Sequence, residues 1–124
     1  MKLAAPTLDN LLRDNVLEVK FTRRRPKPGV PLTRRMLCTN SKGLLLSENG
    51  LGVLNYRPAG GRPINKTLHN IVIAWDIIKQ DYRCITADNC ELITQLPADE
   101  TFWEYFNDHI LTMSVAQKEA FLNS

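Results

Sequence analysis

Residues 16–40 read VLEVKFTRRRPKPGVPLTRRMLCTN, and this stretch decides the expected fold. In residues 16–22 an apolar side chain stands at every second position, which is the period of a half-buried strand. Residues 33–40 alternate again, less cleanly, and predict a second strand. The prolines between them remove backbone donors and Gly29 permits a turn, so this segment is not helical. The stretch therefore predicts a hairpin with a long, basic connection.

Apolar runs and helical spacing predict the other elements. Three further strands are expected in IVIAWDI (71–77), DYRCIT (81–86) and CELITQL (90–96). Amphipathic helices are expected at residues 7–15, 98–111 and 114–122. Glycine and proline interrupt residues 40–70, where 44–46 and 53–56 are expected to form short strands or to pack over the core.

These elements predict one domain of the α+β class that is mainly β. Five short, sharply turned antiparallel strands close most economically into a small barrel of the SH3 or Sm kind, because closure removes exposed edges. The domain is expected to span residues 1–124, with the barrel in about 16–96 and a C-terminal helical segment in about 98–122. An open antiparallel sheet with helices on one face is the alternative.

Charge is divided unevenly along the chain. Residues 1–70 contain 13 Lys and Arg against 4 Asp and Glu, a net charge of +9. Residues 71–124 contain 3 against 9, a net charge of −6, so the whole chain carries +3. A concentrated positive field attracts polyanions, whereas interleaving of the two halves in the fold would cancel it.

Two basic segments are candidate nucleic-acid contacts, because guanidinium groups bind phosphate oxygens and an aromatic ring can stack on an unpaired base. The candidates of the first segment are Arg23, Arg24, Arg25, Lys27, Arg34 and Arg35. The candidates of the second segment are Tyr56, Arg57, Arg62 and Lys66. The alternative is that these are solubilising charges, with Arg34 or Arg35 bonded to Asp76 or Glu91, and that Tyr56 packs on its own loop.

Five short motifs resemble a family of small bacteriophage proteins assigned an Sm-like or SH3-like barrel. They are VKFTRR, TRRMLCTN, LNYRP, IAWDI and DYRCIT, and they lie within residues 17–96. The family's Arg-Met-x-x-Thr strand, its strand ending in Asp and its aromatic-Arg pair match Arg35, Met36, Thr39, Trp75, Asp76, Tyr82 and Arg83. The chain departs from the family in its two long loops. The resemblance implies a small barrel and a phage-encoded protein, which would act in the host-cell cytoplasm.

Other residues that stand out have structural interpretations. We interpret Asp76, Tyr82 and Arg83 as marking a buried Asp-to-Arg pair across neighbouring strands, and Trp75 as a core residue. The stripe WEYFNDHIL offers Trp103, Tyr105 and His109 as outward aromatic rings for a partner helix, or as core.

The sequence predicts no catalytic, cofactor-binding or metal-binding residue and no membrane segment. His69 and His109 have no companion at metal-ligand spacing, and Cys38, Cys84 and Cys90 form no CxxC pair, so the thiols are expected to be reduced. No apolar run approaches the roughly 20 residues of a membrane span, and the start MKLAAPTLDN lacks the pattern of a signal peptide.

Together these features predict a non-enzymatic, phage-encoded binding module that contacts nucleic acid, DNA or RNA, through its basic loops. The alternative is an effector that binds and modulates a host protein of the transcription, nucleic-acid processing or defence machinery.

Overall fold

The computed structural model of the chain describes residues 4–22, 28–29, 32–57 and 70–122, with side chains through residue 118. In chain order its helices and strands are α1 (Ala5–Asp14), β1 (Asn15–Thr22), β2 (Thr33–Thr39), α2 (Lys42–Leu45), α3 (Glu48–Gly52), β3 (Ile71–Asp76), β4 (Asp81–Thr86), the 3₁₀ turn η1 (Ala87–Asn89), β5 (Cys90–Pro97), α5 (Glu100–Tyr105), the π-helical turn η2 (Phe106–Ile110) and α6 (Val115–Leu122). The protein is therefore a small α+β protein, and all five predicted strands are confirmed.

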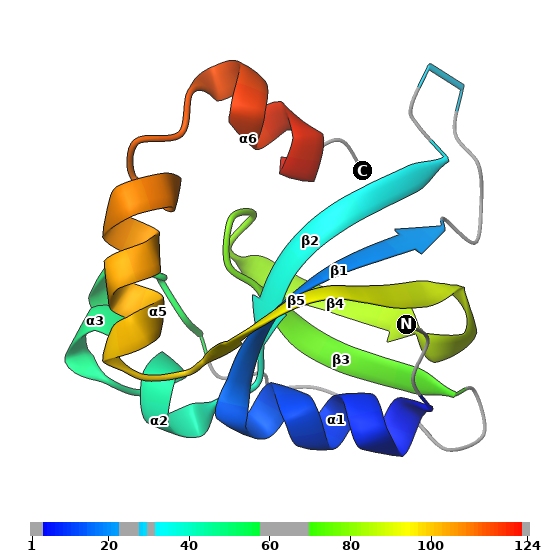
Figure 1. Cartoon of the computed structure of the whole chain (residues 1–124), viewed down its shortest axis with the longest axis horizontal. Coiled ribbons are helices and arrows are strands. Elements are labelled where there is room, and N and C mark those ends of the chain that lie inside the picture. The colour runs from blue at the N-terminus through cyan, green and yellow to red at the C-terminus, as the bar shows by residue number, and fades with distance from the viewer. Residues whose placement is uncertain (1–3, 23–27, 30–31, 58–69, 123–124) are drawn as a thin grey trace.

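The strands form one antiparallel sheet in the order β4-β3-β2-β1-β5. β1 lies between β2 and β5, so that Leu17 is opposite Cys38 on one side and Gln95 on the other. The sheet is open, because β5 pairs with β1 and not with β4, and these two strands end it (Figure 1). The pairing therefore follows the open-sheet alternative, and the closure of a barrel is not among the strand pairings of the described residues.

Helices cover both faces of the sheet, whereas that alternative placed them on one face. Figure 1 shows α1 along one side of the sheet and α2, α3 and α5 together at another. The α1 face buries Leu8, Leu12, Leu17, Val19, Met36, Cys38, Val72, Ala74 and Ile85. The opposite face buries Val16, Leu37, Leu44, Leu45, Leu54, Tyr56, Trp75, Phe102, Phe106 and Ile110. Both faces are apolar because adjacent residues such as Val16 and Leu17 point to opposite sides of β1 and are both fully buried.

Of the two alternatives for residues 44–46 and 53–56, short strands or packing over the core, the structure shows the second: Leu44, Leu45, Leu54 and Tyr56 are buried in the core. Two short helices, α2 and α3, lie in this part of the chain. Ser41 and Ser47 start them, because each side-chain oxygen accepts a hydrogen bond from a backbone N–H in the first turn, from Leu44 at 3.3 Å and from Gly50 at 3.0 Å. Gly50 is required where α3 packs on α2, since a Cβ there would overlap the carbonyl oxygens of Leu44 and Leu45. α3 is thereby held close against the core.

The predicted C-terminal helices are confirmed, with one irregularity. Asp99 caps α5 by accepting a hydrogen bond from the backbone N–H of Thr101 at 2.8 Å. α5 then widens into η2, where the N–H of Leu111 donates to the carbonyl of Phe106, five residues earlier, at 3.0 Å. Such π-helical turns occur frequently at functional sites. Within the described ranges, none of the helices has the length and apolarity that crossing a membrane would require.

Candidate functional site

Six of the predicted nucleic-acid contacts lie outside the described residues. They are Arg23, Arg24, Arg25, Lys27, Arg62 and Lys66. Their contact with nucleic acid stays a prediction. The structure places the other four candidates, which are Arg34, Arg35, Tyr56 and Arg57.

Arg34 is buried in an ion pair, so its prediction as a surface contact is wrong. Its Nη2 atom donates to Oδ2 of Asp76 at 2.6 Å, and both side chains are about 1% exposed. The residue lies on the α1 face of β2, opposite Phe21, and its guanidinium group lies 5.9 Å from the centre of that ring. A side chain held in this position is not available to a phosphate on the surface.

The same ion pair gives Asp76, which stands out in the resemblance, a structural role. The buried pair that we inferred from Asp76, Tyr82 and Arg83 forms with a different arginine: Asp76 pairs with Arg34 on the neighbouring strand, which confirms the alternative that Arg34 is bonded to Asp76. Burial raises the pKa of Asp76 to about 6, although the charges of Arg34 and Arg83 act in the opposite direction. Nε of Arg83 is buried and has no hydrogen-bond partner among the described residues.

Arg35 and Arg57 remain at the surface, each beside a carboxylate. Nη2 of Arg35 donates to Oε2 of Glu18 at 2.8 Å, and half of the arginine side chain is exposed. Nη2 of Arg57 lies 3.8 Å from Oδ1 of Asp81, and 73% of that side chain is exposed. The exposed pair of Arg57 with Asp81 is weak, so Arg57 can still take other partners, whereas Glu18 is largely buried and its pair with Arg35 is only half exposed.

Tyr56 is also buried, which corrects its prediction as a platform for an unpaired base. Only 4% of the residue is exposed, because its ring packs edge-on against Trp75 at 5.2 Å. Its hydroxyl accepts hydrogen bonds from Nζ of Lys42 at 2.7 Å and from the hydroxyl of Tyr82 at 2.9 Å. Burial acts to raise the pKa of Tyr56, but these two hydrogen bonds and the Lys42 charge outweigh it and lower the pKa. The three aromatic rings belong to the core, as expected for Trp75.

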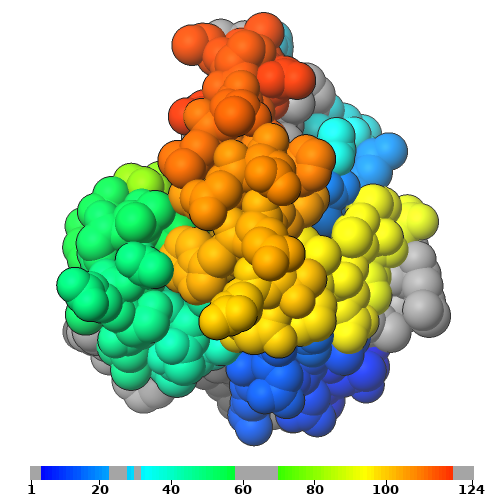
Figure 2. Space-filling model, turned by 60° about the vertical axis from the view of Figure 1, so that its left-hand side comes forward, coloured from blue at the N-terminus to red at the C-terminus, as the bar shows by residue number. Residues whose placement is uncertain are grey.

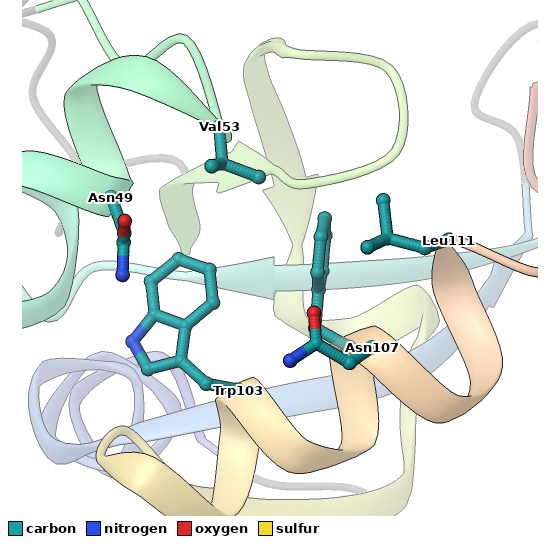
Figure 3. A pocket seen from close by; sticks show the side chains of 6 residues that line it. Asn49, Val53, Trp103, Asn107 and Leu111 are labelled. Atoms are coloured by element: carbon teal, nitrogen blue, oxygen red, sulfur yellow. The ribbon is translucent and has the colours of Figure 1, made fainter.

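A groove opens at the surface between α3 and the helix formed by α5 and η2. Its volume is about 160 Å³, and we call it the α3–α5 groove; its lining residues are Asn49, Val53, Trp103, Phe106, Asn107 and Leu111. Figure 2 shows the two walls next to each other, α2 and α3 in green and α5 with η2 in orange. In Figure 3, Trp103, Asn107 and Leu111 project from one wall towards Asn49 and Val53 of the other. Segments far apart in the sequence thus build one site.

Two residues that line the α3–α5 groove, Trp103 and Phe106, belong to a cluster of packed aromatic rings. Phe102 is fully buried on the inner side of α5, and its ring centre lies 5.1 Å from that of Trp103 and 5.8 Å from that of Phe106. Trp103 and Phe106 also contact each other edge to face at 5.7 Å. The partly buried Trp103 is therefore held in place by Phe102 and Phe106, and a partner would meet a preformed surface.

Two exposed apolar side chains, Val53 and Leu111, line this groove. Leu46, Leu51 and Val115 are exposed as well, and they lie directly after α2, on α3 and on α6. In the described ranges, Leu32 and Ile93 are the large apolar side chains exposed elsewhere. Leu111 is 60% exposed at the end of the groove. Apolar surface gathered in one area marks an interaction site more often than single scattered residues do.

The helices that form the groove also carry acidic residues, which lie outside its lining. They are Glu48 on α3, Glu100 and Glu104 on α5, and Asp108 on η2, and all four residues are exposed. The sequence has no Lys or Arg in residues 44–56 or 98–117. No ion pair involves these four carboxylates in the part of the chain that the structure describes.

The aromatic stripe of α5 gave only part of this site from sequence. Trp103 was among the three rings expected to face a partner, and it lines the groove. Tyr105 and His109 lie outside the groove lining and pack against each other with tilted rings, whose centres are 4.7 Å apart, and His109 is exposed. Leu111 and Val53 were not predicted. The available signal was the spacing of Trp103, Asn107 and Leu111 at every fourth position, beside a stripe of acidic residues at the same spacing.

The described residues contain no group of three or more His, Cys, Asp or Glu side chains placed to hold a metal ion. Cys38, Cys84 and Cys90 are free thiols, and burial raises the pKa of Cys38 and Cys90. The chain matches no protein-family model, no curated protein and no solved structure. The resemblance to phage barrel proteins therefore stays a prediction.

Proposed function

We propose that this protein is a non-enzymatic module that binds another protein through the α3–α5 groove. The observation that carries the proposal is a surface groove lined by the exposed side chains of Val53 and Leu111 and by the packed rings of Trp103 and Phe106. Of the functions expected from the sequence, this is the effector that docks on a partner protein. Two predicted nucleic-acid contacts, Arg34 and Tyr56, are buried in the core, which weakens the competing function.

The groove has about the size of one anchor side chain. An enclosed apolar cavity of about 150 Å³ accepts a benzene-sized group. The α3–α5 groove measures about 160 Å³, is open to solvent, and has two asparagines among its six lining residues. Trp103 and Leu111 offer apolar surface that a partner can cover, and tryptophan is enriched among residues that dominate binding energy. Asn49 and Asn107 provide amide groups at the edge for hydrogen bonds that orient the partner.

The identity of the partner follows only from the resemblance. A phage-encoded protein would meet host proteins in the host-cell cytoplasm, and binding would modulate the host protein concerned. A barrel of the SH3 or Sm kind, expected from the same resemblance, would place this binding site on helices added to the barrel rather than on its loops.

Selection from a random peptide library tests the proposal. We expect the wild-type protein to enrich peptides that the Leu111→Ser variant does not bind, because the substitution removes apolar surface from the groove. Because Leu111 is exposed, the free energy of unfolding of the variant should lie within about 0.5 kcal/mol of the wild-type value. Ile93→Ser, an exposed apolar residue on β5, is the matched control and should keep the same peptides. If Leu111→Ser selects the same peptides as the wild type, the groove is not the docking site.

Nucleic-acid binding is a second candidate, favoured by the β1–β2 register. Thr22 pairs with Thr33, so both ends of the connection that carries Arg23, Arg24, Arg25 and Lys27 are held at one end of the sheet. Fluorescence anisotropy of labelled oligonucleotides across a salt series tests it. Binding that weakens steeply with salt and is lost when residues 23–25 are replaced by Ser would favour this candidate, since each phosphate contact releases counterions.

A further inference from the structure

We infer that the α3–α5 groove accepts a basic segment of its partner. One apolar side chain of that segment lies in the groove, and its Lys or Arg side chains lie along the acidic residues beside the groove. The inference rests on the proposed function and adds the chemistry of the partner. It is carried by an acidic stripe, defined as Glu100, Glu104 and Asp108, that runs beside the apolar residues of the groove.

Helical geometry puts the two stripes side by side. Glu100, Glu104 and Asp108 are each four residues apart, and so are Trp103, Asn107 and Leu111. Residues at this spacing share one side of a helix. Each acidic residue also lies three positions before a groove residue, and residues three apart are neighbours on a helix surface. The first helical residue of the opposite wall, Glu48, adds a carboxylate next to Asn49. A partner in the groove would therefore lie beside the acidic stripe.

The acidic stripe does not stabilise the helix that carries it. Like charges four residues apart on a helix repel each other, so Glu100 with Glu104 and Glu104 with Asp108 are unfavourable pairs. Asp108 lies in the last turn before Leu111, where the partial negative charge of the helix end disfavours a carboxylate. Glu100 alone, in the first turn of α5, has a favourable position. A positively charged partner would relieve this repulsion.

Charge complementarity decides between possible occupants. A neutral apolar segment would fill the groove but leave the carboxylates without partners. An acidic segment would be repelled by them. A basic segment gains attraction along the rim, which raises the association rate and disfavours acidic competitors. The rim is exposed, so we expect the charges to select the partner and the apolar anchor to supply most of the affinity.

The peptides selected in a groove-dependent manner, meaning those bound by the wild type but not by Leu111→Ser, provide the probes. We expect them to share one apolar residue flanked by an excess of Lys and Arg over Asp and Glu. A labelled peptide from this pool should bind the triple variant Glu100→Gln, Glu104→Gln, Asp108→Asn about tenfold more weakly. The control is the triple variant Asp9→Asn, Asp14→Asn, Asp88→Asn, which removes the same number of negative charges from α1 and η1. It should keep the affinity within about twofold of the wild type.

The outcomes separate the inference from the proposed function. Groove-dependent peptides without an excess of basic residues, or a peptide whose affinity is the same for both triple variants, would overturn the basic partner while leaving protein docking at the groove intact. A failure to recover any groove-dependent peptide would overturn the proposed function itself. Peptide sequences and affinities report binding. Thermal unfolding of each variant shows separately whether a loss of binding comes from a loss of the fold.

Discussion

The ion pair of Arg34 with Asp76 and the α3–α5 groove place their side chains in opposite environments. Two charged side chains lie in the interior on the α1 face of the sheet, about 1% exposed, while Leu111 and Val53 lie on the surface. In the first region every charge has a partner close by, and removing one group leaves the other buried alone. In the second region both the apolar surface and the carboxylates lack partners within the described residues.

This difference separates residues that specify the fold from residues available for binding. An arginine is ordinarily an obvious candidate for a surface contact, yet Arg34 connects β2 to β3 from within. A leucine is ordinarily an obvious candidate for the core, yet Leu111 is exposed. Residue type alone therefore misassigns both, and the environment of each side chain assigns it. We expect substitutions in the first region to change stability and substitutions in the second to change binding.

The largest effect is expected from breaking the buried ion pair. Arg34→Met and Asp76→Ala should each lower the free energy of unfolding by about 3–5 kcal/mol, because the remaining charge is buried without its partner. The double variant Arg34→Met, Asp76→Leu should lose less than either single variant, since no unpaired charge remains. Urea denaturation measures all three.

The exposed pair of Arg57 with Asp81 is the control for this comparison. Arg57→Gln should change the free energy of unfolding by less than about 1 kcal/mol, because that pair is solvated. Losses of similar size for Arg57→Gln and Arg34→Met would contradict the distinction between the buried and the exposed pair.

The second prediction concerns pH. Burial raises the pKa of Asp76 to about 6 in the folded state, against about 3.9 in an unfolded chain. Between these values the folded protein holds a proton that the unfolded chain has lost. The contribution of Asp76 to stability is therefore complete below about pH 4 and is lost as the pH rises through about 6.

An NMR titration of the Asp76 carboxyl carbon should have its midpoint near pH 6. Asp76→Asn should remove this component from the pH dependence of unfolding. A midpoint below about pH 4 would mean that attraction to Arg34 and Arg83 outweighs burial, and the pair would then stabilise the charged carboxylate.

A smaller effect is expected from the glycine that sets the groove wall. Gly50→Ala should cost about 1–3 kcal/mol, because the added methyl group overlaps the carbonyl oxygens of Leu44 and Leu45 and forces α3 to shift. The same shift should weaken the binding of the groove-dependent peptides. Gly52→Ala, in the same helix, meets no atom within 4 Å and should be neutral or gain about 0.5–1 kcal/mol. Equal losses in stability for both variants would contradict this account of the wall.

The sequence predicts the strands well because period and apolar runs are local signals. Residues 16–22 and 71–77 show this most clearly, and both form strands. α2 and α3 were missed because helices of four and five residues are too short for a periodic pattern. The open sheet was not foreseen as the main expectation, since periodicity identifies a strand such as β5 without identifying the strand that it pairs with.

The candidate site was less predictable because it depends on which face a side chain occupies. Arg34 and Arg35 are adjacent in a strand and so point to opposite faces, and the sequence alone does not say which one is buried. Tyr56 carries a hydroxyl that water could satisfy, but Lys42 and Tyr82 satisfy it inside. The two walls of the groove, α3 and α5, are separated in the sequence by β3, β4 and β5. No local sequence pattern extends over that separation.

The position of β1 between β2 and β5 has a consequence during synthesis of the protein. β2 follows β1 closely in the sequence and can pair with it early. The other partner of β1 is β5, whose Pro97 pairs with Asn15 and is synthesised 82 residues later. Until that last strand leaves the ribosome, the other edge of β1 exposes backbone groups without a partner strand, the kind of edge on which chains aggregate. Contacts so distant in sequence also slow folding. The first strand to be made is thus among the last to be completed.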